Sequence, residues 1–290
     1  MNEAQGPGGA EDGRTVVVIG GTSGIGAAVA ERFAASGAEV IAAGLGADPA
    51  AHPPPGPAAG QPPHSPATRP QAGQPLPSPA AGPQNGPHSP AEGPQSGRPL
   101  PGAVRAVELD LTEPGALEGF LGGLGKLDVL VNAAGVIARN AEYDPEVFAR
   151  VIDVNLTGTM RACVAAHDLL RRSRGCVVNV ASMLSFFGGP KSPAYTASKG
   201  GVMQLTKALA VAWAAEGIRV NAVAPGWIRT ALTAALHEDG AAARRIVERT
   251  PMGRWGEPGD VAGAVAFLCG PDARFITGVV LPVDGGYLAA

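Results

Sequence analysis

The chain has few charged residues and almost no excess of either sign. Only 16% of its 290 residues are charged, and the formal net charge is −3. Such a chain lacks the basic excess that binds phosphates, which argues against a nucleic-acid partner or an anionic membrane surface. The hydrophobic share of 45% is enough for one sizeable core.

Cysteine is also scarce. Cys163, Cys176 and Cys269 are odd in number and widely spaced, which fits neither a metal site nor a disulfide framework. The first 14 residues are polar and Gly-rich, without the apolar segment of a signal peptide. No apolar run reaches the roughly 18–20 residues needed to cross a membrane. We therefore expect packed thiols, no metal, no membrane association and a cytoplasmic location.

Proline is concentrated in one segment. Residues 47–102 hold 18 of the 28 prolines and few large apolar side chains, and the phrase Pro-His-Ser-Pro-Ala occurs there at 63–67 and 87–91. Burial of so little apolar surface cannot offset the entropy lost on ordering. We predict a disordered insert that interrupts one domain, residues 14–290, behind a flexible N-terminus of residues 1–13.

Outside this insert, β-branched apolar runs alternate with helical patterns. The predicted strands are residues 15–20, 39–43, 105–109, 128–132, 176–181, 218–223 and 279–283. The predicted helices are residues 24–36, 113–122, 144–172, 195–216 and 258–269. Continuous Val/Ile runs between helices indicate a parallel sheet buried on both faces. The expected fold is a doubly wound α/β, Rossmann-like sandwich.

A glycine-rich turn joins the first strand to the first helix. Glycines in a GxxxGxG spacing let the backbone turn tightly, and the helix N-terminus offers free N–H groups to a pyrophosphate. A turn alone is weak evidence, but its place between a strand and a helix favours dinucleotide binding. The residues assigned to this role are Gly20, Thr22, Ser23, Gly24, Ile25 and Gly26.

Two further strand ends carry candidate cofactor residues. Asp110 and Leu111 follow the third strand, where the carboxylate would reach the adenine ring or merely cap a helix. Residues 132–135 follow the fourth strand as Asn132, Ala133, Ala134 and Gly135. Small residues there would let the backbone approach the adenosine ribose, or would simply pack tightly.

Tyr195 and Lys199 lie four residues apart in a predicted helix, and therefore on one face. A tyrosine is a poor base at neutral pH because its pKa is about 10. A nearby ammonium, a cofactor's positive charge and a dry pocket would lower that pKa. The pair by itself is weak evidence, since this spacing also occurs on ordinary solvated helices.

The motifs together resemble the short-chain dehydrogenase/reductase family. The ordered set is the glycine turn, residues 132–135, residues 154–158, Ser182 thirteen residues before Tyr195, Tyr195-x-x-x-Lys199 and residues 224–226. The resemblance covers residues 14–290 apart from the insert. The motifs in this order are far more specific than any one motif alone. It implies NAD(P)-dependent interconversion of a secondary alcohol and a ketone.

The resemblance also implies roles at matching positions. Tyr195 would be the general acid/base, Lys199 would lower its pKa and hold the nicotinamide ribose, and Ser182 would bind the substrate oxygen. Asn155 would anchor a water that relays protons to Lys199. The residues expected on the nicotinamide side are Pro225, Gly226, Ile228 and Thr230.

The cofactor choice is less direct. The resemblance implies an Asp at the end of the second strand in NAD-binding members, and this chain has Gly44 there. It implies an Arg just after that strand or in the glycine turn of NADP-binding members, and this chain has Leu45 and Ser23 there. Because an unpaired 2′-phosphate is the harder group to accommodate, the sequence favours NAD over NADP. Ile19 and Ala133 depart from the family's frequent Thr and Asn, which would weaken cofactor affinity without removing the catalytic groups.

The substrate remains open at this stage. The loop at residues 182–189 is similar to that of sugar-acid and deoxygluconate dehydrogenases, although Phe186 and Phe187 equally suit a flat or acyl substrate. We predict a sugar-acid alcohol, with a 3-oxoacyl thioester reductase as the alternative enzyme. Arginines at 229, 244, 245 and 254 would pair a substrate carboxylate or stay solvated.

Two expectations concern partners. A non-catalytic, nucleotide-sensing relative that binds partners through the insert is the alternative of another class, but such proteins usually lose the Tyr or Lys. The resemblance further implies a homodimer or homotetramer packed through the helices that begin at Asp144 and Tyr195 and the C-terminal strand.

Overall fold

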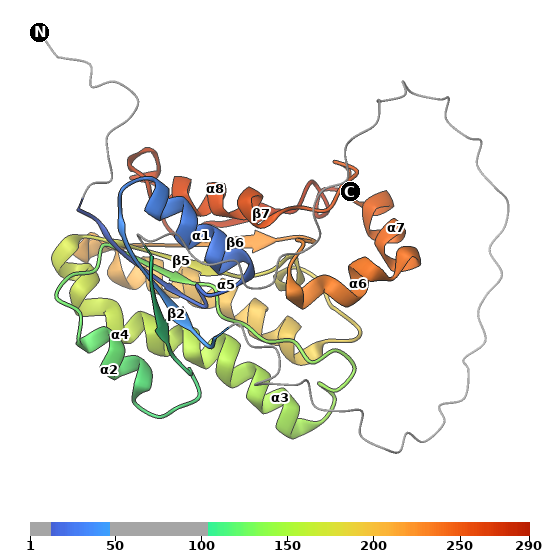
Figure 1. Ribbon diagram of the computed structural model, residues 1–290, viewed down its shortest axis with the longest axis horizontal. Helices are drawn as coiled ribbons and strands as arrows, with labels where there is room; N and C mark the ends of the chain where they lie inside the picture. The colour runs from blue at the N-terminus through green and yellow to red at the C-terminus, as the bar shows by residue number, and fades with distance from the viewer. Residues whose placement is uncertain (1–12, 47–103) are drawn as a thin grey trace, which may run out of the picture.

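A single parallel sheet organises the chain (Figure 1). The computed structural model describes residues 13–46 and 104–290. Seven strands lie in the order β3-β2-β1-β4-β5-β6-β7, all parallel. They are β1 (Thr15–Ile19), β2 (Glu39–Gly44), β3 (Val104–Glu108), β4 (Val129–Asn132), β5 (Cys176–Val180), β6 (Arg219–Pro225) and β7 (Val280–Val283). The predicted doubly wound α/β fold is confirmed, while the predicted insert at 47–102 and residues 1–12 lie outside the described residues.

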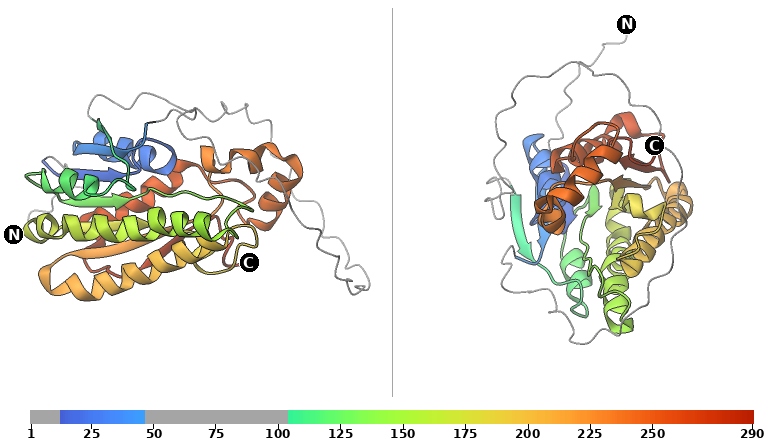
Figure 2. Two further views of the ribbon diagram at one scale, coloured as in Figure 1. Left: turned by 90° about the horizontal axis from the view of Figure 1, so that it is seen from below. Right: turned by 90° about the vertical axis from the view of Figure 1, so that its right-hand side faces the viewer.

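Helices cover both faces of this sheet (Figures 1 and 2). On one face lie α1 (Gly24–Ala35) and α8 (Pro258–Cys269), and on the other lie α2 (Ala116–Gly122), α3 (Pro145–Ile152), α4 (Gly158–Ser173) and α5 (Pro193–Trp213). Central strands are buried on both sides because their side chains alternate between two apolar clusters. Val16 and Val18 join the α1/α8 cluster and Val17 joins the other, each with no exposed surface.

The predicted long helix over residues 144–172 is interrupted. Asp144 caps α3 as expected, since its carboxylate accepts from Glu146 N at 2.8 Å and Val147 N at 3.2 Å, with Pro145 in the first turn. A π-helical turn, Asp153–Thr157, then separates α3 from α4 and contains Asn155. A π turn has no compositional signature, so periodicity could not predict it, and such turns occur frequently at functional sites.

The segment after β6 forms a cover over the carboxyl ends of the strands (Figure 1). It contains a 3₁₀ turn at Ala231–Thr233 and the short helices α6 (Ala234–Glu238) and α7 (Gly240–Arg249). In an open α/β sheet, ligands bind outside these strand ends at the point where the strand order reverses. Here that point lies between β1 and β4, directly beside the glycine turn.

Candidate active site

The glycine turn forms a cradle that side chains would fill. Gly20 has φ +76°, and a Cβ there would lie 2.5 Å from the backbone N of Ala134, while a Cβ on Gly26 would lie 2.0 Å from the Gly20 carbonyl. A Cβ on Gly24 would contact Thr230 at 3.4 Å, so the segment after β6 meets the turn. This backbone surface, at the N-terminus of a 12-residue helix, fits the pyrophosphate of a dinucleotide.

The turn also meets the end of β2. The Thr22 hydroxyl donates to the Leu45 carbonyl at 2.9 Å, and a Cβ on Gly44 would lie 3.1 Å from that hydroxyl. Ser23 precedes α1 as its N-cap but makes no capping bond with its side chain. Thr22, Ser23 and Gly44 are thus gathered at one edge of the cradle, as the sequence predicted for cofactor contacts.

Two predicted cofactor residues are engaged elsewhere. The Asn132 side chain is buried on the face of the sheet that α4 and α5 cover, where its amide donates to Asn179 Oδ1 at 2.9 Å. Only the Asn132 backbone, which is followed by Ala133 and Ala134 against Gly20, borders the cradle. The Asp110 carboxylate accepts from Thr112 N at 2.8 Å and its hydroxyl at 2.7 Å, so it closes a local turn rather than capping α2.

The residues after β6 lie where expected but differ in exposure. Pro225 ends β6, and Gly226 is pressed against the C-terminal segment, because a Cβ there would lie 2.7 Å from Asp284 Cα. Ile228 is buried with 4% exposure in the α1/α8 cluster. Thr230 lies against the glycine turn, since its Cγ2 is 3.4 Å from where a Cβ on Gly24 would be.

Three polar side chains meet near the end of β5. Lys199 is 4% exposed and donates from Nζ to the Val180 carbonyl at 2.7 Å. Its Nζ lies 5.6 Å from the centre of the Tyr195 ring. The Ser182 hydroxyl acts to lower the pKa of the Tyr195 phenol. Ser182 itself is fixed by a bond from Leu184 N to its Oγ at 3.1 Å.

Asn155 fixes the loop after β4. Its Oδ1 accepts from Val136 N at 2.8 Å, and its Nδ2 donates to the Val136 carbonyl at 2.9 Å and to Ser198 Oγ at 3.1 Å. A Cβ on Gly135 would lie 3.3 Å from Lys199 Nζ and 3.4 Å from Asn155 Oδ1. The Asn155 side-chain amide thus bonds to protein groups, and it stabilises the loop beside Lys199. The predicted water relay stays a prediction.

The electrostatics of Tyr195 differ from the expectation. Burial raises the pKa of the Tyr195 phenol, while the Ser182 hydrogen bond and the Arg139 guanidinium act to lower that pKa. Burial also lowers the pKa of Lys199 to about 8. Lys199 Nζ lies 5.6 Å from the centre of the Tyr195 ring and donates to the Val180 carbonyl. The prediction that Lys199 lowers the Tyr195 pKa stays a prediction.

Sequence reasoning missed Arg139 and Glu142. Glu142 is 1% exposed, and its two oxygens accept from Ala138 N and Tyr195 N, both at 2.8 Å. Its carboxylate therefore ties the loop that carries Arg139 to the first turn of α5. Arg139 is half-buried, and its Nη1 donates to the Leu232 carbonyl at 3.1 Å in the cover segment. The signal in the sequence was two opposite charges within seven residues of Gly135, in a stretch with no helical or strand period.

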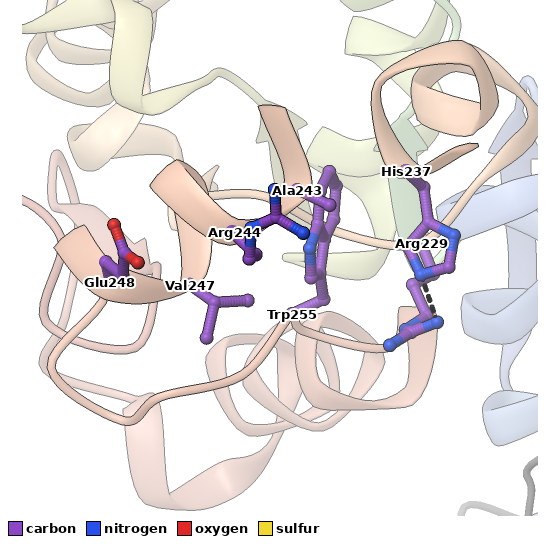
Figure 3. Close-up of a pocket in the computed structure, with 7 residues that line it drawn as sticks. All are labelled: Arg229, His237, Ala243, Arg244, Val247, Glu248 and Trp255. Carbon is purple, nitrogen blue, oxygen red and sulfur yellow. Dashed lines mark hydrogen bonds between the residues drawn. The ribbon is translucent and has the colours of Figure 1, made fainter. Parts of the chain in front are cut away.

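The arginines predicted as carboxylate ligands lie apart from this group. Arg254 pairs with Asp260 at 2.8 Å, and Arg229 pairs with Glu257 at 3.0 Å. Arg229 also contacts His237 and, with Arg244, lines a cavity of about 410 Å³ beside Trp255 (Figure 3). Ser182, Tyr195 and Lys199 do not line this cavity, and the pairing of these arginines with a substrate carboxylate stays a prediction.

Two negative findings apply to the part of the chain that the structure describes. Within residues 13–46 and 104–290, no helix has the length and apolar character needed to cross a membrane. In the same ranges, no group of three His, Cys, Asp or Glu side chains is arranged to hold a metal ion.

Comparisons with known proteins agree with this geometry. A family model described as enoyl-(acyl carrier protein) reductase matches residues 97–288, and one described as short chain dehydrogenase matches residues 14–54. The 2-dehydro-3-deoxy-D-gluconate 5-dehydrogenase of Bacillus subtilis is 41% identical over 187 residues, covering 62% of this chain and 74% of that protein. The cis-4-hydroxycyclohexanecarboxylate dehydrogenase of Sinomonas cyclohexanicum is 45% identical over 171 residues, covering 57% and 67%.

Solved structures give the same result. An Agrobacterium tumefaciens protein provisionally assigned as a 2-deoxy-D-gluconate 3-dehydrogenase, with bound NADP, has a TM-score of 0.74 and 34% identity over 97% of this chain and 98% of its own. A Beutenbergia cavernae protein is provisionally assigned as an NAD(P)-dependent gluconate 5-dehydrogenase and holds NADP at low occupancy. Its structure has a TM-score of 0.75 and 35% sequence identity, and the match covers 97% of this chain and 99% of that protein. The chain belongs to the short-chain dehydrogenase/reductase family and is an NAD(P)-dependent oxidoreductase.

Proposed function

We propose that this enzyme interconverts a secondary alcohol and a ketone on a sugar acid, with Ser182, Tyr195, Lys199 and Asn155 as its working residues. The observation that carries the substrate class is Arg139. Its half-buried guanidinium acts electrostatically on the Tyr195 hydroxyl, where the reacting oxygen would lie. Within the described residues no carboxylate lies within ion-pair distance of Arg139. A carboxylate on the substrate could therefore form an ion pair with its guanidinium.

The relatives support the same class. The names of two similar proteins describe substrates that combine a carboxylate with an alcohol or ketone, namely 2-dehydro-3-deoxy-D-gluconate and 4-hydroxycyclohexanecarboxylate. Because the second is a ring and the first a chain, the shared chemistry is a hydroxyl a few atoms from a carboxylate. That is the pair of groups that Tyr195 and Arg139 would receive.

The proton chemistry involves two hydroxyls. Ser182 acts to lower the pKa of the Tyr195 phenol, and in a complex both hydroxyls would donate to the substrate oxygen. Burial favours the neutral phenol, which suits proton donation to a ketone oxygen. Lys199 is mostly an ammonium at pH 7, since its pKa is about 8, and it adds positive charge on the same helical face. A bound nicotinamide supplies the hydride donor or acceptor.

Positioning is distributed over three elements. The Gly20–Gly26 cradle and Thr230 would hold the pyrophosphate, and Lys199 would hold the nicotinamide ribose. Asn155 accepts from Val136 N and Glu142 accepts from Ala138 N, so the chain leading into Arg139 is fixed at two points. The donors are thereby in place before substrate binds, which lowers the reorganisation needed in the transition state.

The test is a 340 nm assay of wild type, Arg139→Gln and Arg150→Gln with a matched set of substrates. The set contains 2-dehydro-3-deoxy-D-gluconate, gluconate, a neutral cyclic alcohol and acetoacetyl-CoA, each with NAD(H) and NADP(H). Loss of a charged hydrogen-bond pair costs about 3 kcal/mol, so Arg139→Gln should lower kcat/KM for the carboxylates roughly 100-fold. Arg150 is an exposed arginine on α3 and serves as the charge-matched control.

Two outcomes would overturn the substrate assignment. One is wild-type turnover of the neutral alcohol with a kcat/KM equal to that of the carboxylates. The other is a preference for acetoacetyl-CoA, which would favour the acyl thioester alternative that the exposed Phe186 beside Ser182 also suits.

The proposal includes a cytoplasmic homodimer or homotetramer. Exposed apolar side chains on α4 and α5 support self-association, with Val164 54% and Val211 83% exposed. Light scattering on the purified chain tests this point, and a monomer at micromolar concentration would contradict it.

A further inference from the structure

The end of β2 lacks the acidic side chain expected for NAD, but the neighbouring strand supplies one. Gly44 ends β2 and pairs in register with Glu108 of β3. Residues paired in register on parallel strands direct their side chains to the same face of the sheet. The Cα–Cβ direction at Gly44 leads toward Thr22 Oγ1 and Gly20, so this face is the one that carries the glycine cradle. Glu108 therefore leaves the sheet on the cofactor side.

The Glu108 carboxylate lies over the chain that continues from β2. Its Oε1 accepts from Gly46 N at 3.2 Å, and its Oε2 lies 3.4 Å from where a Cβ of Gly46 would be. A side chain at Gly44 would crowd Thr22, whereas a Cβ on Gly46 would make an ordinary contact with this carboxylate. The absence of a side chain at Gly44 thus leaves room beside a negative charge at the edge of the cradle.

The charge there is unopposed within the part of the chain described. Across residues 13–46 and 104–290, no Lys, Arg or His lies within ion-pair distance of Glu108. Its second oxygen has free lone pairs, which can accept from a ribose hydroxyl. A 2′-phosphate at the same place would bring a second negative charge against the first.

We propose that Glu108 selects the cofactor of this enzyme, by accepting a hydrogen bond from the adenosine ribose of NAD and repelling the 2′-phosphate of NADP. The acid thus comes from β3 rather than from β2, and Gly44 makes space for it. Two similar structures hold NADP, so a preference for NAD in this chain requires a feature of its own. The inference rests on the proposed function only in requiring a dinucleotide at the glycine cradle.

Cofactor binding to the substrate-free enzyme tests this directly. Dissociation constants for NADH and NADPH are measured from nucleotide fluorescence for wild type, Glu108→Gln and Glu39→Gln. The amide oxygen of Gln can still accept from Gly46 N, so Glu108→Gln removes charge with little local change. Glu39 is an exposed glutamate at the opposite end of β2 and provides the matched control.

Wild type is expected to bind NADH at least tenfold more tightly than NADPH. Glu108→Gln should bring the two constants within about threefold of each other, mainly by tightening NADPH, while Glu39→Gln keeps the wild-type ratio. Equal binding of both nucleotides by wild type, or an unchanged ratio in Glu108→Gln, would overturn the assignment. Failure of wild type to bind either nucleotide would instead refute the placement of the cofactor, and the substrate assignment is decided separately by the carboxylate assay.

Discussion

The two ends of the cofactor cradle are built in different ways. At the catalytic end, defined by Asn155, Ser182, Tyr195 and Lys199, each polar side chain is held by at least one hydrogen bond or ring contact from the protein. At the adenosine end, defined by residues 44–46, Glu108 and Asp110, small residues leave open space and the carboxylates stand at an exposed edge. Under the two proposals, chemistry would depend on rigid donors, whereas cofactor choice would depend on the sign of one charge.

The largest effect should follow from Tyr195→Phe at the catalytic end. The substitution keeps the ring and removes the proton that the mechanism transfers, so kcat should fall by about 10³. NADH binding should change little, because the adenosine end and the glycine cradle are untouched. Stopped-flow or steady-state assays at 340 nm, together with fluorescence titration of NADH, measure the two quantities separately.

If Tyr195→Phe also lost NADH affinity by a factor similar to its loss of kcat, the catalytic end and the adenosine end would not act independently. Retention of turnover within tenfold of wild type would remove Tyr195 from the proton transfer altogether.

A smaller effect is expected from Gly26→Ala, which acts on the cradle between the two ends. The new Cβ would lie 2.0 Å from the Gly20 carbonyl, so the turn must move. Overpacking of this kind costs about 1–3 kcal/mol, and NADH affinity should therefore fall roughly 10- to 100-fold. Gly119→Ala is the matched control, because a Cβ on this α2 residue meets nothing within 4 Å.

Calorimetric melting of both variants separates misfolding from loss of binding. If Gly26→Ala melts like Gly119→Ala and still binds NADH as wild type does, the glycine cradle is not where the pyrophosphate lies.

The sequence predicted the catalytic end better than its surroundings, for a physical reason. Tyr195, Lys199 and Ser182 occur at spacings that a helix and a strand end convert directly into proximity. Arg139 and Glu142 sit in an irregular loop, and their places depend on hydrogen bonds to Tyr195 N and the Leu232 carbonyl. Those contacts connect segments 53 and 93 residues apart, and no local pattern encodes them.

The adenosine end shows the same limit. Gly44 was correctly placed at the end of β2, but the acid beside it belongs to the next strand. That pairing crosses the long insert, and only the register Gly44↔Glu108 reveals it. The position of Asn132 at a strand end predicts a cofactor contact. Alternation within β4 instead directs its side chain to the face that α4 covers, where it bonds Asn179.

The most subtle prediction concerns the pH dependence of alcohol oxidation at the catalytic end. Oxidation requires Tyr195 to accept a proton, so the rate rises as pH passes through the phenol pKa. Arg139 lowers the Tyr195 pKa and Glu142 raises it. Arg139→Gln should therefore move the midpoint of the kcat profile to higher pH, and Glu142→Gln should move it to lower pH, with kcat at the plateau within about tenfold of wild type.

The opposite signs make this pair of variants informative, because a general loosening of the loop would shift both profiles alike. The profiles should be recorded with a neutral alcohol at saturation, so that loss of the carboxylate contact at Arg139 does not enter kcat. Shifts of the same sign, or none, would mean that the observed midpoint belongs to another group. Lys199 would then be the candidate, since burial lowers its pKa to about 8.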